Sequence, residues 1–242
     1  MERSATARGV TALTCRGGAA LFADASSVPA AGSAGRIAAA AVESIAALVG
    51  APVPVLWAEQ RHGTTSFVYG QHAPLPVAAH CVGQCDAIIT AEPHVALLVL
   101  TADCLPVALV GEEVVAIVHA GWRGLAADIL GAVLRRIGNE FGVSPGQLTA
   151  ILGVGVGPCH YPVGTEVREA LAVHPVAWSD WSVDGAVDLS RWAAGRLLAL
   201  GVPPGGVLRL AGCTACSDRY HSYRRDGAGA GRQWSAVVLT PR

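Results

Sequence analysis

The stretch Val95–Gly124, VALLVLTADCLPVALVGEEVVAIVHAGWRG, decides how this chain folds. It contains three short apolar runs, Val95–Thr101, Pro106–Val110 and Val114–Val118, and each has the length of a buried strand. Turn residues such as Gly111 separate the runs. We therefore predict three successive strands here, with polar residues left at the strand ends.

Residues that can bind a metal stand shortly after such runs. Cys104 follows the first run and His119 follows the third. Upstream, His62 lies in the segment Gln60–Gly63, which comes after a further apolar run, Pro52–Trp57. A polar residue just past a buried strand emerges at the rim of a sheet, where side chains from several strands can converge. A His/Cys/His set leaves a fourth position open, as catalytic zinc sites do, whereas structural zinc takes four protein ligands.

The same residues have simpler explanations. A buried thiol is commonly an inert small apolar group, and a lone histidine at a strand end commonly serves packing or solvation. Cys104 and His119 could instead be the nucleophile and base of a cysteine hydrolase, a use that needs the same atoms. A fourth protein ligand would make the set a non-enzymatic, zinc-stabilised binding module. Further histidines are available for this, among them His72, His80, His160 and His221.

The composition is that of an apolar globular protein. The chain has 242 residues, of which 52% are hydrophobic and 14% are charged, which is far from a disordered composition. The formal net charge of −1 provides no electrostatic surface for nucleic acid or an anionic membrane, so we expect neither as a partner. All 17 basic residues are arginine, which excludes Schiff-base and lysine general-base chemistry.

We find no targeting signal in the sequence. The segment Met1–Arg8 lacks the apolar region of a secretory signal, and no run of about 18 residues is free of charges and helix breakers. The seven cysteines form an odd set. We therefore expect a cytoplasmic protein whose cysteines are thiols or metal ligands rather than a disulfide framework.

Outside the deciding stretch, the sequence pattern predicts strands mainly in the first half. Helices are expected over Ala34–Val49, Leu125–Phe141 and Asp188–Leu200, each followed by a glycine. Further strands are expected over Val10–Cys15, Ala19–Phe22, Val53–Trp57, Ser66–Tyr69, Ala87–Thr90, Leu148–Val154 and Trp234–Leu239. Because strands and helices do not alternate strictly, the predicted class is α+β. With no repeat and no linker, residues 1–242 are expected to form one domain.

Arginines near these motifs are candidates for binding an anion. Arg123 lies four residues after His119, and Arg224 and Arg225 lie in a segment followed by several glycines. Guanidinium groups bind phosphate and carboxylate through two parallel hydrogen bonds, so such a cluster near a metal would suit an anionic nucleophile. The alternative is a solvated turn with surface ion pairs.

Cys213 and Cys216 have the spacing of half a zinc knuckle or of a redox motif. Cys81 and Cys85 are available to complete a four-cysteine site. No helix pattern begins after Cys213, which argues against thioredoxin-like chemistry. Plain thiols are the remaining alternative.

Several motifs occur together in a characteristic order. They are Gln60-Arg61-His62-Gly63, CDAIIT at 85–90, TADCLP at 101–106, HAGWRG at 119–124 and Tyr223-Arg224-Arg225-Asp226-Gly227. With them the chain resembles the bacterial YfiH family, long labelled multicopper polyphenol oxidase or laccase-like and later recognised as enzymes of purine nucleoside metabolism. The human laccase-domain protein FAMIN belongs to the same group. The resemblance runs from about Arg16 to the C-terminus and is most specific over residues 60–124.

The resemblance implies a single α+β domain with mixed sheets layered between helices. It implies a zinc ion, with copper as the alternative metal, held by His62, Cys104 and His119. It also implies a purine nucleoside phosphorylase that acts on adenosine, inosine and 5′-methylthioadenosine with inorganic phosphate, with adenosine deaminase activity beside it. We expect a monomer. The alternative activity, copper-dependent oxidation of phenols, fits less well because a trinuclear copper cluster needs many histidines, and the chain has only 8.

Further residues are expected to act beside the metal set. Asp103 is a candidate for acid–base catalysis together with His62, Cys104 and His119. Candidate contacts to nucleoside or phosphate are Arg16, Gln60, Arg123 and Arg225. The chain departs from the family pattern after Arg16-Gly17-Gly18, where a short Ala/Ser/Gly stretch replaces a longer loop, and at Pro162, which replaces a glutamate. Proline removes one carboxylate and one backbone donor at that point.

Overall fold

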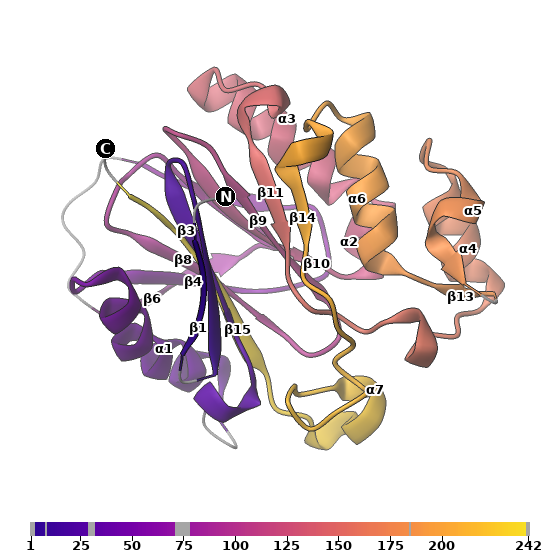
Figure 1. Cartoon of the computed structure of the whole chain (residues 1–242), viewed down its shortest axis with the longest axis horizontal. Helices are drawn as coiled ribbons and strands as arrows, with labels where there is room; N and C mark the ends of the chain where they lie inside the picture. The colour runs from indigo at the N-terminus through magenta and orange to yellow at the C-terminus, as the bar shows by residue number, and fades with distance from the viewer. Residues whose placement is uncertain (1–2, 8, 29–31, 71–77, 184, 241–242) are drawn as a thin grey trace.

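The computed structural model describes residues 3–7, 9–28, 32–70, 78–183 and 185–240. Two large mixed sheets stack on each other, and helices cover both outer faces (Figure 1). The predicted α+β class, with mixed sheets layered between helices, is confirmed.

The first sheet has seven strands in the spatial order β1-β2-β3-β15-β8-β4-β6. Their bounds are Arg3–Ala7, Val10–Cys15, Gly18–Ala23, Gln233–Leu239, Ala96–Thr101, Val55–Glu59 and Ala79–Gln84. Strand β4 runs parallel to both of its neighbours, β6 and β8, while the remaining pairs are antiparallel. The C-terminal strand β15 therefore lies inside the sheet, between β3 of the three N-terminal strands and β8.

The second sheet has six strands in the order β14-β11-β9-β10-β7-β5. Their bounds are Val207–Arg209, Thr149–Leu152, Leu105–Val110, Val115–Ala120, Ala87–Thr90 and Ser66–Tyr69. A separate two-stranded hairpin pairs β12 (Ser182–Val183) with β13 (Ala186–Val187).

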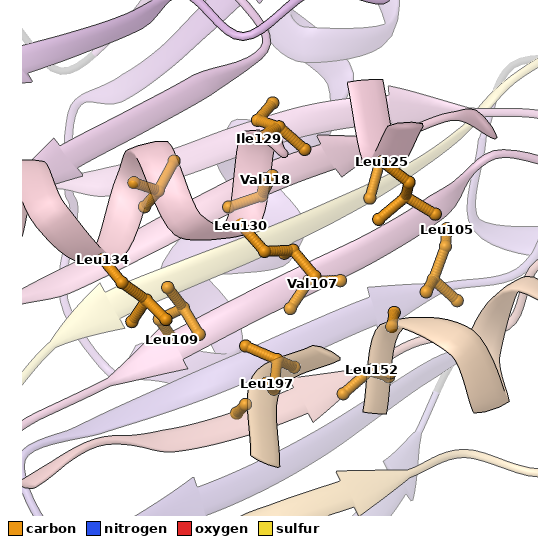
Figure 2. Close-up of a cluster of buried hydrophobic side chains, with 14 of the residues drawn as sticks. Leu105, Val107, Leu109, Val118, Leu125, Ile129, Leu130, Leu134, Leu152 and Leu197 are labelled. Carbon is orange, nitrogen blue, oxygen red and sulfur yellow. The ribbon is translucent and has the colours of Figure 1, made fainter. Parts of the chain in front are cut away.

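The deciding stretch is continuously apolar because its strands are buried on both faces. Side chains alternate between the faces of a strand. In β9, Val107 and Leu109 face the helices, whereas Ala108 and Val110 face the first sheet. Figure 2 shows the helix side of this arrangement, where Leu130 lies over Val107 and the other labelled side chains surround them.

Helix α1 (Ala34–Val49) covers the outer face of the first sheet through Ile37, Ala41 and Ile45. The outer face of the second sheet is covered by α2 (Trp122–Ala126), α3 (Ile129–Phe141), α4 (Thr165–Ala172), α5 (Trp178–Trp181) and α6 (Leu189–Ala199). A short helix, α7 (Tyr223–Asp226), precedes β15. The 16-residue α1 has the predicted bounds. Helix α6 begins directly after Asp188, whose carboxylate accepts a hydrogen bond from the Arg191 amide (2.8 Å).

The prediction of one helix over Leu125–Phe141 is wrong. Asp128 adopts the left-handed conformation (φ 65°) and divides the segment into α2 and α3. Aspartate tolerates this conformation because its short side chain bonds locally. Here its carboxylate accepts from the Gly131 amide at the start of α3 and from Arg196 of α6 (2.9 Å). The break thus separates α2 from α3.

Candidate metal centre

Strand pairing brings three predicted residues together. Cys104 directly precedes β9, and His119 lies near the end of β10. In the antiparallel β9–β10 pair, Ala120 is opposite Leu105, so the end of β10 lies beside the start of β9. His62 lies in the loop after β4. Because β4 is parallel to β8, this loop and the β8–β9 connection leave the first sheet at the same end of its strands.

The donor atoms of His62, Cys104 and His119 all lie within 4.8 Å of one another. The two imidazole rings meet edge to face with 4.8 Å between centroids. His119 is buried at 3% exposure, Cys104 is half-buried and His62 is exposed. The arrangement offers one thiolate and two imidazoles on the solvent-facing side of the sheet edge, which is a suitable donor set for zinc or copper.

Asp86 organises this set, and the sequence analysis gave it no role. It is buried at 1% exposure directly before β7. Its carboxylate accepts hydrogen bonds from the amides of the loop residues Arg61, His62 and Gly63, at 2.7 to 3.2 Å. It also contacts Nδ1 of His119 at 2.8 Å. This contact leaves Nε2 of His119 for a metal, which is the usual carboxylate–histidine–metal arrangement.

The electrostatics of the site favour a thiolate. Burial opposes ionisation of Cys104, but hydrogen bonds from His119 and His62 outweigh it and lower the pKa of the thiol to about 6. Burial likewise opposes protonation of His119, but Asp86 and the Cys104 thiolate outweigh it and raise the pKa of the imidazole to about 9. The pKa of Asp86 is lowered because bonds from His119, Gly63 and His62 outweigh its burial. A bound cation would replace the His119 proton as the partner of the thiolate.

Gly121 provides a test of whether a metal fits. A Cβ atom at this position would lie 3.0 Å from Cδ2 of His62, 3.1 Å from Sγ of Cys104 and 3.9 Å from Cε1 of His119. The absence of that methyl group leaves open space among the three donors. His62 (φ 61°) and Asp103 (φ 86°) adopt the left-handed conformation beside the same space, a strain that is typical of functional sites. The donor set and the space beside it therefore fit a metal ion.

Asp103 links the site to the C-terminal segment. Its carboxylate accepts hydrogen bonds from Oγ1 of Thr214 (2.5 Å) and from the Arg224 amide (2.6 Å). Its carbonyl accepts from the Val156 amide (2.9 Å). These contacts indicate that Asp103 positions the segments around the site.

Tyr161 is a second residue that the sequence analysis did not assign to the site. Burial raises the pKa of its phenol to about 12, with a further contribution from the Cys104 thiolate that Arg224 and Arg123 oppose. The guanidinium of Arg224 lies 5.5 Å from the Tyr161 ring centroid. A protonated phenol and two guanidinium groups thus share the surroundings of Cys104. In the sequence, the only signal for Tyr161 was its position two residues after Cys159, next to Pro162.

The four predicted substrate contacts are not brought together. Arg123, on α2, is exposed with its guanidinium over Trp122 (4.3 Å). The Gln60 amide is used by both backbone groups of Leu100, at 2.7 and 2.8 Å. Arg225 holds its own loop together through the carbonyls of Thr214, Ser217 and Tyr220 and the carboxylate of Asp226.

Arg16 lies at the opposite end of the first sheet. It forms an ion pair with Glu112 (2.8 Å) in the β9–β10 turn. Its neighbour Gly18 is opposite Leu239, whereas Thr101, which leads to Cys104, is opposite Gln233. Six residues of strand separate the two points, about 20 Å. Arg16 is therefore placed away from the metal set, and the proposed N-terminal contact to substrate has no support in this geometry.

Pro162 occupies a segment that the C-terminal loop covers. Its carbonyl accepts a hydrogen bond from Nη2 of Arg224 (2.5 Å), and the His160 carbonyl accepts from Nε of the same guanidinium (3.2 Å). Only the carbonyl of residue 162 is used in these contacts, so proline is tolerated there.

The other histidines do not join the metal set in the described part of the chain. His80 lies in β6 opposite Leu56. A Cβ on Gly231 would touch the ring of His221, so that ring packs against the backbone. His160 belongs to a different cluster, and His72 lies outside the described residues. The described residues therefore supply three donors and leave the fourth position open.

The structure does not support the alternative in which Cys81 and Cys85 complete a four-cysteine site with Cys213 and Cys216. Cys81 is exposed in β6, and Cys85 is buried at 2% exposure in the core between the sheets. Cys213 and Cys216 instead lie together with Cys159 and His160.

Among the described residues, no helix is long and apolar enough to cross a membrane.

The chain is similar to known proteins over much of its length. A family model described as "multi-copper polyphenol oxidoreductase laccase" matches residues 30–240. The purine nucleoside phosphorylase of Streptomyces coelicolor is 38% identical over 192 residues, which cover 76% of this chain and 76% of that protein. A purine nucleoside phosphorylase of Bacteroides thetaiotaomicron is 36% identical over 163 residues, which cover 64% of this chain and 60% of that protein.

Two solved structures show the same fold. The structure of YlmD from Geobacillus stearothermophilus matches with a TM-score of 0.82 at 22% identity and covers 98% of both chains. The Bacillus licheniformis hypothetical protein YfiH matches with a TM-score of 0.77 at 20% identity, over 92% of this chain and 93% of that one. Both sheets and their helix layers are therefore shared with these proteins.

Proposed function

The chain belongs to the multi-copper polyphenol oxidoreductase laccase family, and we propose that it is a zinc-dependent purine nucleoside phosphorylase with adenosine deaminase activity beside it. The observation that carries the proposal is the set of His62, Cys104 and His119, whose donor atoms lie within 4.8 Å of one another. Relatives named purine nucleoside phosphorylase share 32–38% identity with the chain, which supports this class of reaction. We propose adenosine, inosine and 5′-methylthioadenosine as substrates, and a single-domain monomer in the cytoplasm as the working form.

In this reaction, phosphate displaces the purine from C1′ of the ribose. The C1′–N9 bond breaks, a C1′–O bond to phosphate forms, and the purine leaves with a proton. When bound, zinc would supply Lewis acidity at the position that the three ligands leave open. The remaining work is positioning and electrostatic stabilisation by the protein.

We assign the binding of phosphate to Arg123. In the described part of the chain, no carboxylate forms an ion pair with its guanidinium, which lies over Trp122. Helix α2, which carries Arg123, begins directly after Gly121, the residue next to the three donors. A guanidinium that is exposed and free of ion pairs can offer two parallel donors to an oxyanion. Arg224 and Arg225 are already used by backbone carbonyls, so they act by holding the C-terminal segment.

Tyr161 is the proposed hydrogen-bond donor to the substrate. Its phenol stays protonated at neutral pH, since its pKa lies at about 12. Asp103, which we expected to take part in acid–base catalysis, has both carboxylate oxygens engaged by Thr214 and Arg224. We therefore assign Asp103 a positioning role. Proton transfer is left to Tyr161 and to groups of the bound substrate.

Copper-dependent oxidation of phenols is the second candidate, because the family carries that description. In the described residues, the metal set holds two histidines and one cysteine, and the other cluster holds one histidine. A trinuclear copper centre needs more imidazoles than these clusters contain. The oxidase therefore has weaker support than the phosphorylase.

The test is to assay purified protein of known metal content with adenosine, in phosphate buffer and in phosphate-free buffer. We expect adenine and ribose 1-phosphate only with phosphate, and inosine in both buffers from deamination. Cys104→Ser should remove the metal at this site and both activities, whereas Cys81→Ser, an exposed thiol in β6, should keep them. Turnover by Cys104→Ser protein free of metal, or stoichiometric copper with phenol oxidation and no phosphorolysis, would contradict the proposal.

A further inference from the structure

A second cluster of metal-binding side chains lies apart from the first. Cys159 and His160 belong to a 3-10 turn, η3 (Pro158–His160), and Cys213 and Cys216 belong to the loop after β14. The four donor atoms lie within 4.8 Å of one another. More than 50 residues of sequence separate the two pairs, so the fold, rather than chain proximity, brings them together.

The distances within the cluster match a tetrahedral shell. Nδ1 of His160 lies 3.3 Å from Sγ of Cys159, 3.4 Å from Sγ of Cys216 and 3.8 Å from Sγ of Cys213. Sγ of Cys159 and Sγ of Cys216 are 3.4 Å apart. With Zn–S bonds of about 2.3 Å and Zn–N bonds of about 2.0 to 2.1 Å, a tetrahedron has edges of about 3.6 Å between nitrogen and sulfur and about 3.8 Å between sulfurs. The observed distances fall within a few tenths of an ångström of these values.

The backbone around the cluster is also arranged for a thiolate. The Gly157 amide donates a hydrogen bond to Sγ of Cys213 (3.1 Å). A Cβ at Gly157 would lie 3.1 Å from Cβ of Cys213, 3.4 Å from its Sγ and 3.5 Å from Sγ of Cys159. A side chain at Gly157 would therefore crowd two of the four donors.

We propose that Cys159, His160, Cys213 and Cys216 bind a second zinc ion with a structural role. Three cysteines and one histidine fill all four positions of a tetrahedral ion, which leaves none for a substrate. This differs from the His62, Cys104 and His119 set, where three donors leave one position open. The second site therefore stabilises a local structure and takes no part in the reaction itself.

A disulfide between Cys159 and Cys216 is the competing use of these thiols. That bond would leave Cys213 and His160 without a common partner, although both point into the same small volume. In the structure all of these cysteines are free thiols. Convergence of four donors, rather than two, favours the metal.

The ion would fasten two segments that border the first metal set. Next to His160 lies Tyr161, and the His160 carbonyl accepts a hydrogen bond from Arg224. Between Cys213 and Cys216 lies Thr214, whose hydroxyl donates to Asp103, the neighbour of Cys104. Loss of the second ion should therefore loosen the C-terminal loop and the position of Tyr161 while leaving the first donor set in place.

The test is the zinc content of the full chain, measured by mass spectrometry after purification under reducing conditions. We expect two zinc ions per chain in the unmodified protein, one in Cys104→Ser, one in Cys216→Ser and two in the control Cys81→Ser. Zinc content in Cys216→Ser equal to that of the unmodified protein would overturn the proposal. Because the expected loss in Cys104→Ser concerns the first site, the second site is tested independently of the proposed activity.

X-ray absorption of the Cys104→Ser protein tests the site without altering the cluster. The only zinc left should be bound by three sulfurs and one nitrogen. Replacement by cobalt(II) should give strong thiolate charge-transfer bands and the visible bands of a tetrahedral ion. A shell of nitrogen and oxygen only, or a Cys159–Cys216 disulfide found in peptides of the zinc-treated reduced protein, would overturn the proposal.

Discussion

The substitution Asp86→Asn is the sharpest test of how the first metal centre is built. The carboxylate accepts from the amides of Arg61, His62 and Gly63 and contacts Nδ1 of His119 at 2.8 Å. A carboxamide of the same shape keeps one oxygen, but its NH₂ group must face a backbone donor. We therefore expect the loop that carries His62 to lose its support and His119 to lose its orientation.

The magnitude follows from the contacts. One buried amide left without an acceptor costs about 1 to 3 kcal/mol, and replacing charge-assisted bonds to His119 by neutral ones costs about 1 to 2 kcal/mol more. Together these amount to about 2 to 5 kcal/mol of the free energy of unfolding, a large share of a typical total of about 5 to 15 kcal/mol. For the metal, losing the partner of a ligating histidine lowers affinity by about 10- to 100-fold.

The assay combines urea unfolding of the metal-free protein with zinc competition against a chelator. Asp188→Asn is the matched control, because Asp188 is also a nearly buried carboxylate with several partners, but it caps α6 away from the metal set. The control should lose stability and keep its zinc affinity at the first site. If Asp86→Asn binds zinc there within about twofold of the unmodified protein, the role given to Asp86 is refuted.

Three further predictions follow from the same geometry. Gly121→Ala should lower zinc affinity at the first site by at least about tenfold, because the new Cβ would lie 3.0 to 3.1 Å from His62 and Cys104. Unchanged affinity in a chelator titration would show that the residues that bind the zinc ion lie elsewhere. Zinc binding at the first site, measured in Cys216→Ser protein, should release about one proton per ion between pH 6.5 and 9. Cys104, with a pKa of about 6, is already ionised there, while His119, with a pKa of about 9, still holds its proton. The zinc affinity of this site therefore rises with pH up to about 9, and calorimetry in buffers of different ionisation enthalpy that finds no proton release would contradict this. Arg123→Ala should raise the KM for phosphate by about 10- to 100-fold, which corresponds to the loss of a charged bidentate contact of about 1.5 to 3 kcal/mol. Arg225→Ala should mainly lower the melting temperature. Equal phosphate KM values for the Arg123 variant and the unmodified enzyme would show that Arg123 does not bind phosphate.

The parts of the fold that could be predicted from sequence are those whose signal is local. Strands such as β8, β9 and β10 are buried on both faces, so their apolar runs are unbroken and easily recognised. Strands β1, β6 and β14 were not predicted, and each lies at the edge of a sheet. An edge strand is paired on one side only and carries no continuous apolar pattern, as the sequence AHCVGQ of β6 illustrates. The break at Asp128 was missed because its partner Arg196 is 68 residues away.

The same distinction explains the site. His62, Cys104 and His119 could be predicted because each follows an apolar run, and strand ends meet at sheet edges. Asp86 precedes its strand, and its role depends on amides that lie 23 to 25 residues away. No rule of spacing could pair Cys213 with His160, since 53 residues of sequence separate them.

The placement of the first metal set at the junction between the two sheets has a consequence for its stability. Cys104 ends the connection from β8 in one sheet to β9 in the other, and His119 belongs to the second sheet. His62 follows β4 of the first sheet, but its amide donates to Asp86, which directly precedes β7 of the second sheet. His62 thus follows a strand of the first sheet, His119 lies in the second, and Cys104 lies in the connection between them. The three donors therefore converge only when the two sheets pack against each other in the observed position. Metal affinity at this site therefore depends on the packing between the sheets as well as on the ligands themselves, and a metal bound there stabilises that packing in return.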